Sequence, residues 1–330
     1  MKKGLYILYG LALLTGCSND NDGLQSADSD KLVPLEIAAN INSPSVAITR
    51  AAETAWEASD QIGVFVTTHN TATIYSDGTG TKGLNRLYTF DDGTNYETYG
   101  NTYRLFSTND RKVYLPSYGV DIYGIYPYKE SSSLVYSSPA EAENPTELPK
   151  VPVDVSIQTS QKAIDLMRAR TGNISNSSPV IELLFYHRMT KLVFNLKQGE
   201  GLLTDELKDA TYLGMTIDKQ YTQANYKILE DECSITSADY STITPIRASS
   251  APTGYVRTFE AIVLPNSASN PVQDRTVTIT FYQNPNDQIV NTFKIPSSIY
   301  FYPGTKYTFN VTVNATSIQV NMDNKYTEQW

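Results

Sequence analysis

The chain has 330 residues, enough for two ordinary domains, and its acidic side chains outnumber its basic ones by 35 to 26, a formal net charge of −9. That balance argues against a nucleic-acid partner. With only two cysteines, Cys17 and Cys233, and two histidines, a disulfide framework and a Cys/His metal cluster are excluded, so stability has to come from core packing.

The first 17 residues have the order of a bacterial lipoprotein leader. Two lysines precede an apolar run, residues 5–14, that is too short to span a bilayer as a stable helix, and Leu14-Thr15-Gly16-Cys17 follows. A small residue before the cysteine fits the peptidase, and the thiol can carry a thioether-linked lipid. We therefore expect a signal peptide at residues 1–16 and lipidation at Cys17, which would hold the chain on a membrane. The alternative is an ordinary buried cysteine after a secretory leader.

The segment 17–50 combines a tether with a strand. Its first part is polar and acidic and has little to bury, so we expect a disordered tether that serves either as an export label or only as a solvated linker. An alternating stretch follows, and Arg50-Ala51 comes shortly after it. The apolar residues predicted to share one face of this strand are Val33, Leu35, Ile37, Ala39 and Ile41.

The remainder of the chain has the pattern of an all-β protein. Short runs rich in Val, Ile, Thr and Tyr are separated by Gly, Pro, Asn and Asp, and 24 residues are tyrosine. Helices are predicted only at residues 160–168 and 203–210. Strands are predicted at residues 61–66, 112–115, 121–126, 181–186, 191–196, 255–264, 275–282, 289–295 and 306–313.

A Ser/Asn-rich break at residues 171–178 predicts a domain boundary. It divides the chain into an N-terminal domain of residues 51–177 and a C-terminal domain of residues 178–330. Many short strands with turn signals between them favour two β-sandwiches over a barrel.

Catalytic patterns are weak. His69 lies in a polar loop, and His187, at a predicted hairpin, is expected to be a turn or core histidine; no G-x-S-x-G elbow supplies a nucleophile. Residues 78–83 match G-x-G-x-x-G, but neither a buried strand before them nor a helix after them is predicted, so we expect a flexible loop. The sequence therefore predicts no enzyme, cofactor or metal site.

Several segments, in this order along the chain, resemble the fimbrillins, the type V pilus subunits of gut and oral Gram-negative bacteria. The resemblance covers nearly the whole chain. The segments are Ile48-Thr49-Arg50-Ala51, residues 56–65 (Trp-Glu-Ala-Ser-Asp-Gln-Ile-Gly-Val-Phe), residues 120–128, residues 165–169, residues 183–192 and residues 302–307.

The resemblance implies two transthyretin-like β-sandwich domains in tandem and a precursor that is lipidated and carried to the cell surface. It also implies cleavage after an arginine by an outer-membrane protease, for which Arg50-Ala51 is the candidate site, and polymerisation by strand exchange. The implied partners are other copies of the chain or related fimbrillins, the outer membrane through the lipid before processing, an arginine-specific protease, and a host or bacterial surface receptor.

The residue pattern supplies both halves of such an exchange. Removal of the strand at residues 33–41 would leave an apolar groove and unpaired backbone donors in the first domain. Near the C-terminus, Ile318, Val320 and Met322 alternate with polar residues, and Tyr326 and Trp330 keep the same parity. This tail is predicted to fill a neighbour's groove by β-augmentation. The alternative is that it is the last strand of its own domain.

The sequence thus favours a structural pilus subunit that supports adhesion. One alternative is an anchor or tip subunit, which would keep its N-terminal strand or lack a free donor tail. Another is a surface glycan-binding lipoprotein, since exposed aromatic side chains can stack on sugars.

Overall fold

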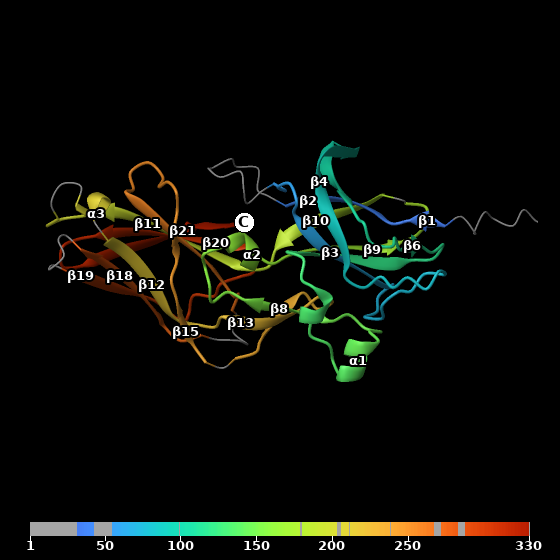
Figure 1. The fold of residues 1–330 in the computed structure, drawn as a ribbon. Coiled ribbons are helices and arrows are strands. Elements are labelled where there is room, and N and C mark those ends of the chain that lie inside the picture. The colour runs from blue at the N-terminus through green and yellow to red at the C-terminus, as the bar shows by residue number, and fades with distance from the viewer. Residues whose placement is uncertain are drawn as a thin grey trace, which may run out of the picture. The chain divides into compact units, whose positions relative to one another are not determined.

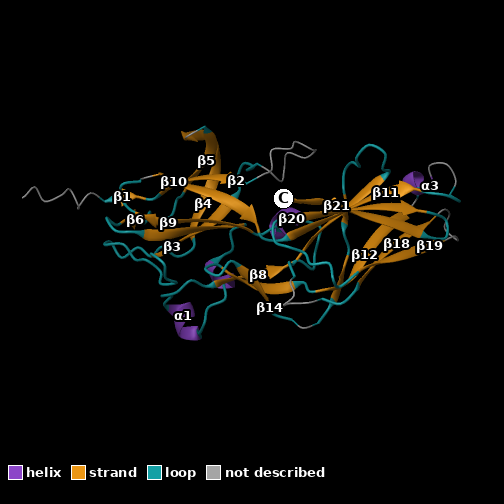
Figure 2. Cartoon of the chain, turned by 180° about the vertical axis from the view of Figure 1, so that it is seen from behind, coloured by secondary structure: helices purple, strands orange, loops and turns teal. Residues whose placement is uncertain are grey.

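The computed structural model describes residues 32–42, 55–98, 100–178, 180–202, 206–210, 212–237, 239–266, 272–282 and 288–329. Within them the regular secondary structure is almost all strand, joined by loops and a few short helices, as Figures 1 and 2 show. The predicted all-β class is therefore confirmed. No helix in the described ranges has the length and apolar character needed to cross a bilayer.

Seven strands close into a barrel in the order β10, β2, β5, β4, β3, β7, β9. A short pair outside it joins β1 (Val33–Pro34) to β6 (Tyr114–Leu115). The barrel strands are β2 (Glu36–Ile41), β3 (Gln61–Thr68), β4 (Arg86–Thr98), β5 (Asn101–Ser107), β7 (Val120–Tyr126), β9 (Met167–Ile174) and β10 (Val180–His187).

This closure corrects the expectation of a sandwich in the first half of the chain. One strand, β2, pairs antiparallel with β5 on one side and parallel with β10 on the other, which joins the two edges of the sheet. Alternating side chains mark one buried face in a sandwich and in a barrel alike. The pattern along the sequence therefore cannot show which strand edges meet.

The second half forms two sheets that share one core. A five-stranded sheet, β16-β17-β11-β20-β21, faces a four-stranded sheet, β15-β12-β18-β19, and inward side chains of both form one apolar cluster, so this half is a β-sandwich. Its strands are β11 (Thr190–Gln198), β12 (Tyr212–Gln220), β15 (Ser241–Ile243), β16 (Ile246–Arg247), β17 (Arg257–Val263), β18 (Arg275–Tyr282), β19 (Gln288–Ile295), β20 (Thr305–Val313) and β21 (Ile318–Gln329).

A third sheet interlocks the two halves. In the sequence, β8 (Lys150–Asp154) lies between the barrel strands β7 and β9, but it does not pair with either of them. It pairs with β13 (Gln223–Lys227), which also pairs with β14 (Glu232–Ile235). Val151, Val153 and Tyr226 of this sheet share an apolar cluster with Phe65 and Tyr123, from β3 and β7 of the barrel. Figure 1 shows β8 and β13 side by side. The two halves are therefore not independent units joined by one linker.

The predicted boundary between residues 177 and 178 falls between β9 and β10, which are both barrel strands. The chain passes from the barrel to the sandwich between β10 and β11, at Arg188. Arg188 donates through Nε and Nη2 to Asp231, at 2.5 and 2.8 Å, and Arg168 of β9 lies 3.3 Å from the same carboxylate. Asp231 lies in the turn of the β13–β14 hairpin, with a φ of 60°. Its carboxylate therefore links the third sheet to Arg188, where the chain passes from the barrel to the sandwich.

The helices are short. They are η1 (Ser131–Ser133), α1 (Pro139–Glu143), α2 (Gln161–Ile164) and α3 (Glu206–Asp209). The helix predicted at residues 160–168 ends early because β9 begins at Met167 and takes up the chain. Of the helix predicted at residues 203–210, residues 203–205 lie outside the described ranges.

A buried carboxylate organises one end of β7. Asp121 is fully buried, and its oxygens bind His69 Nδ1 at 2.7 Å, Arg170 Nη2 at 3.1 Å and the backbone N–H groups of Asn70 and Asn173 at 3.1 and 3.0 Å. Burial alone would raise the pKa of this carboxyl group, but these hydrogen bonds outweigh it and lower the pKa to about 2. Asp121 therefore stabilises the fold as an anion.

We predict that Asp121→Asn lowers the free energy of unfolding by about 2 kcal/mol at pH 7. Because the folded pKa is lower than the unfolded one, the same contribution in the unaltered chain is present above about pH 4 and lost as the pH falls towards about 2. Urea unfolding at pH 7 and pH 2.5 measures both effects. Asp239→Asn, at an exposed carboxylate, is the control; equal stability of the two variants at pH 7 would contradict the assignment.

Candidate functional site

The predicted removable strand lies in the core of the barrel. Leu35, Ile37 and Ala39 are fully buried and Ile41 is 7% exposed, and all four belong to the barrel's apolar cluster. Val33 lies outside the barrel, in β1, and is half-buried. The alternation found in the sequence thus corresponds to side chains that fill the barrel interior.

The backbone of β2 completes the barrel as well. On one side Ile37, Ala38 and Ala39 pair with β5, and on the other the whole of β2 pairs with β10 from Val180 to Phe185. Figure 1 shows β2 beside β10. Without β2, both neighbouring strands would face an open groove with unpaired backbone groups.

Two side chains from other strands and loops also bind the backbone of β2. The indole Nε1 of Trp56 donates to the Ala39 carbonyl at 3.2 Å, and the Tyr88 hydroxyl donates to the Leu35 carbonyl at 3.0 Å. Sequence reasoning missed both contacts. Trp56 follows Arg50 closely in the sequence, but neither the spacing nor the residue type indicates that its N–H reaches a strand that precedes Arg50.

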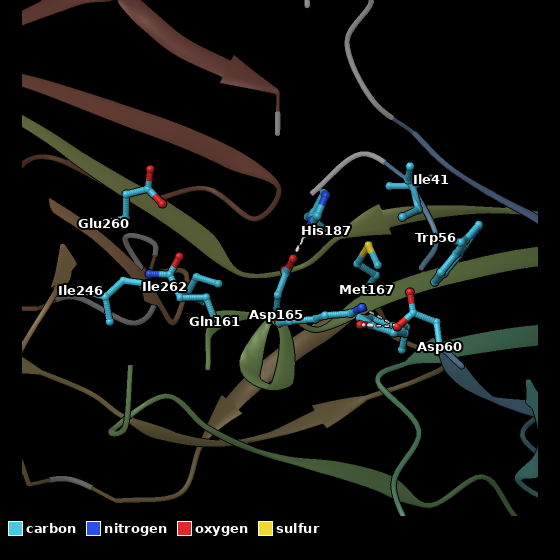
Figure 3. A pocket seen from close by; sticks show the side chains of 13 residues that line it. Ile41, Trp56, Asp60, Gln161, Asp165, Met167, His187, Ile246, Glu260 and Ile262 are labelled. Atoms are coloured by element: carbon cyan, nitrogen blue, oxygen red, sulfur yellow. Dashed lines mark hydrogen bonds and ion pairs between the residues drawn. The ribbon is translucent and has the colours of Figure 1, made fainter. Parts of the chain in front are cut away.

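A cavity of about 240 Å³ opens where β2 ends. Figure 3 shows Ile41 and Trp56 on one side of it, with Asp60, Asp165 and His187 among the polar side chains of its wall. These residues come from β2, the loop before β3, the α2 region and the end of β10.

Several charged groups of this cavity are paired. Lys162 Nζ lies 2.8 Å from Asp60 and 2.5 Å from Glu57, and His187 Nδ1 lies 2.8 Å from Asp165. Burial alone would lower the pKa of Lys162, but the two carboxylates raise it, which keeps the amine charged and not nucleophilic. Among the described lining residues there is no Ser, Thr or Cys beside the His–Asp pair.

The predicted donor segment is an edge strand in the isolated chain. Among the described strands, β21 pairs with β20 alone, with Ile318 opposite Val313 and Met322 opposite Phe309, and the register then shifts before Thr327. Ile318 and Met322 pack on the sandwich core, whereas Val320 is 36% exposed. The tail therefore occupies its own sheet here, and its role as a donor stays a prediction.

Several predicted positions are not described. Cys17, Arg50, Ala51 and Trp330 lie outside the described residues, as does the side chain of Tyr326. Cys233 packs against the cluster that joins the third sheet to the barrel. Burial raises the pKa of its thiol to about 12, so it has little thiolate character.

Comparison with known proteins decides the family. Residues 49–324 match the family described as fimbrillin-like. The chain belongs to this family. The fimbrillin-like chain is also 27% identical, over 97% of its own length and 94% of the relative's, to a protein of Bacteroides uniformis named "Putative fimbrium subunit Fim1C".

Solved structures share the fold of this fimbrillin-like chain. A structure titled "putative cell adhesion protein" from Bacteroides uniformis covers 92% of this chain and 100% of its own, with a TM-score of 0.62 and 24% identity. Another with that description, from Bacteroides ovatus, covers 91% and 98%, with a TM-score of 0.60 and 18% identity.

We predict that Ile37→Ala lowers the free energy of unfolding of the uncleaved chain by about 2 to 5 kcal/mol, because it leaves a cavity in the barrel core. Chemical denaturation followed by tryptophan fluorescence measures this loss. Glu36→Ala, at the neighbouring exposed position, removes only an exposed ion pair with Lys112 at 3.5 Å and should cost less than about 1 kcal/mol. Equal costs at the two positions would be inconsistent with β2 as a core strand.

Proposed function

We propose that this fimbrillin-like chain is a structural subunit of a cell-surface pilus that supports adhesion. It is exported as a lipoprotein anchored through Cys17, cleaved between Arg50 and Ala51, and polymerised when the tail of one copy replaces β2 in the next. The observation that carries this proposal is that β2 both places its apolar side chains in the barrel core and closes the barrel. No catalytic step by this chain is involved.

The position of Arg50 in the sequence gives cleavage a structural consequence. β2 ends at Ile41 and β3 begins at Gln61, and Arg50 lies between them. Cleavage there breaks the only covalent link between β2 and the rest of the barrel, since the chain before β2 leads to the N-terminus. From then on β2 is held by non-covalent contacts alone and can be replaced.

The energetics favour replacement of β2 over its loss. Leu35, Ile37 and Ile41 each contribute about 1.5 to 3 kcal/mol of burial, which an empty groove would forfeit together with its ladder hydrogen bonds. A donor strand with apolar side chains at alternate positions restores both, less the cost of ordering it. β21 supplies Ile318, Val320 and Met322 at such positions, and as an edge strand it has to leave only β20.

The related protein named as a fimbrium subunit supports the pilus role, and the two similar solved structures, both described as cell adhesion proteins, support an adhesive one. The partners proposed are copies of this chain or related fimbrillins, an arginine-specific protease, the outer membrane before processing, and a surface receptor on a host or bacterial cell. An anchor or tip subunit would share the barrel but would keep β2 in place or lack a tail able to leave its own sheet.

We predict that Val320→Lys abolishes polymerisation while the monomer stays folded. In the chain's own sheet Val320 is partly exposed, so lysine there should cost about 0.5 kcal/mol or less. In a neighbour's groove the ammonium would be buried without a partner, which is far more costly. Electron microscopy of material sheared from cells that export and process the chain counts filaments, and the melting temperature of the purified chain reports folding.

The matched control is Gln319→Lys, which adds the same charge at the adjacent exposed position on the other face of β21. It should leave filament number unchanged. Filaments formed by Val320→Lys at the normal level would rule out this face of β21 as the donor face. Loss of filaments in both variants would point to a general effect of charge and contradict the proposed face.

A further inference from the structure

We propose that Trp56 and Tyr88 are backbone anchors of the β2 groove, which bind the carbonyl groups of whichever strand occupies it. This inference rests on the proposed strand exchange and assigns the residues that make the groove accept strands of different sequence. The two hydrogen bonds, from Trp56 Nε1 to Ala39 and from the Tyr88 hydroxyl to Leu35, are both made to main-chain oxygens. A replacing strand can therefore make both whatever its side chains are.

The spacing of the two acceptors restricts how a strand can enter. In an extended strand the carbonyls of residues i and i+4 point to the same edge and lie about 13 Å apart. A slip by one residue turns these carbonyls towards the other edge and loses both hydrogen bonds. A slip by two keeps both but changes the side chain at the position of Ala39, which is fully buried in the same apolar cluster as Trp56. The two anchors thus determine which alternate set of carbonyls of the incoming strand faces them. Side-chain packing then determines which of the remaining registers the strand adopts.

Trp56 is held by strands that stay after cleavage. Its ring makes edge contacts with Phe106 of β5, Tyr126 of β7 and Phe185 of β10, at centroid distances of 5.1, 5.4 and 5.2 Å. Phe185 reaches this position because Gly124 has no side chain; a Cβ there would lie 2.5 Å from its ring. β5 and β10 are the two neighbours of β2, so the indole is fixed by the walls of the groove.

Tyr88 is likewise part of the chain that stays. It is 2% exposed, belongs to the barrel core through β4, and burial raises the pKa of its hydroxyl, so it remains a proton donor at any physiological pH. In an empty groove the indole N–H and the hydroxyl would both lose a protein acceptor in apolar surroundings. A strand that enters the groove with its carbonyls facing Trp56 and Tyr88 restores both hydrogen bonds.

The direct test follows the indole N–H of Trp56 by NMR. The chain has two tryptophans, so in a Val320→Lys, Trp330→Phe background Trp56 is the sole one and the chain cannot donate its own tail. We expect slow hydrogen exchange of this N–H in the uncleaved chain, fast exchange after cleavage at Arg50 and removal of the N-terminal segment, and slow exchange again when a synthetic peptide of residues 318–329 is added.

Affinity for the same peptide supplies the second readout. Trp56→Phe keeps an aromatic ring but removes the donor, and Tyr88→Phe removes only the hydroxyl; each should weaken the peptide Kd by about threefold to tenfold. Tyr212→Phe, at an exposed tyrosine of the sandwich, is the control and should leave the Kd unchanged.

The outcomes separate the two proposals. A cleaved chain, otherwise able to fold, that binds no peptide overturns strand exchange and the anchors together. Peptide binding with fast indole exchange in the complex, or with Kd values unchanged in both Phe variants, overturns the anchors and leaves strand exchange standing. The exchange measurement keeps Trp56 and Tyr88 intact, so it decides the matter even where a Phe variant does not fold.

Discussion

The barrel depends on one strand, β2, which precedes the proposed processing site at Arg50 in the chain. β2 is paired on both edges and supplies fully buried side chains, so the barrel is closed only while β2, or a strand equivalent to it, is present. This requirement is met by backbone hydrogen bonds and by apolar side chains at alternate positions, both of which many strands can provide. If the closing strand is exchanged in this way, as we propose, the protein is suited to assembly in series.

The rest of the chain is arranged so that loss of this strand need not unfold it. The sheet of β8, β13 and β14 covers the outer face of β3 and β7, opposite to the face that β2 helps to bury. Asp231 binds arginines from the barrel and from the crossing to the sandwich, and Asp121 fixes the far end of β7. These contacts involve no residue of β2, so after the proposed cleavage they would persist and preserve the walls of the groove.

The positions of the strands could be predicted from the sequence far better than the pairing of the strands with one another. Alternation placed Leu35 and Ile37 on one face, and both are fully buried, because burial of one face imposes a period of two on a strand. It could not reveal that β8 pairs with β13, or that β2 joins β5 to β10, since such pairings depend on contacts between segments distant in the chain. The hydrogen bonds of Trp56 and Tyr88 to the backbone could not be predicted for a related reason. A side chain that donates to a distant backbone carbonyl leaves no local pattern in the sequence.

The central claim is that β2 leaves the subunit and is replaced. The most direct measurement is the N-terminal residue of the subunit in filaments sheared from the cell surface, determined by mass spectrometry and compared with the membrane fraction. The account predicts filament subunits that begin at Ala51 and lack residues 32–41, with the lipidated Cys17 form confined to membranes. Filament subunits that retain residues 32–41 would contradict it, because the groove would then still be filled by the chain's own strand.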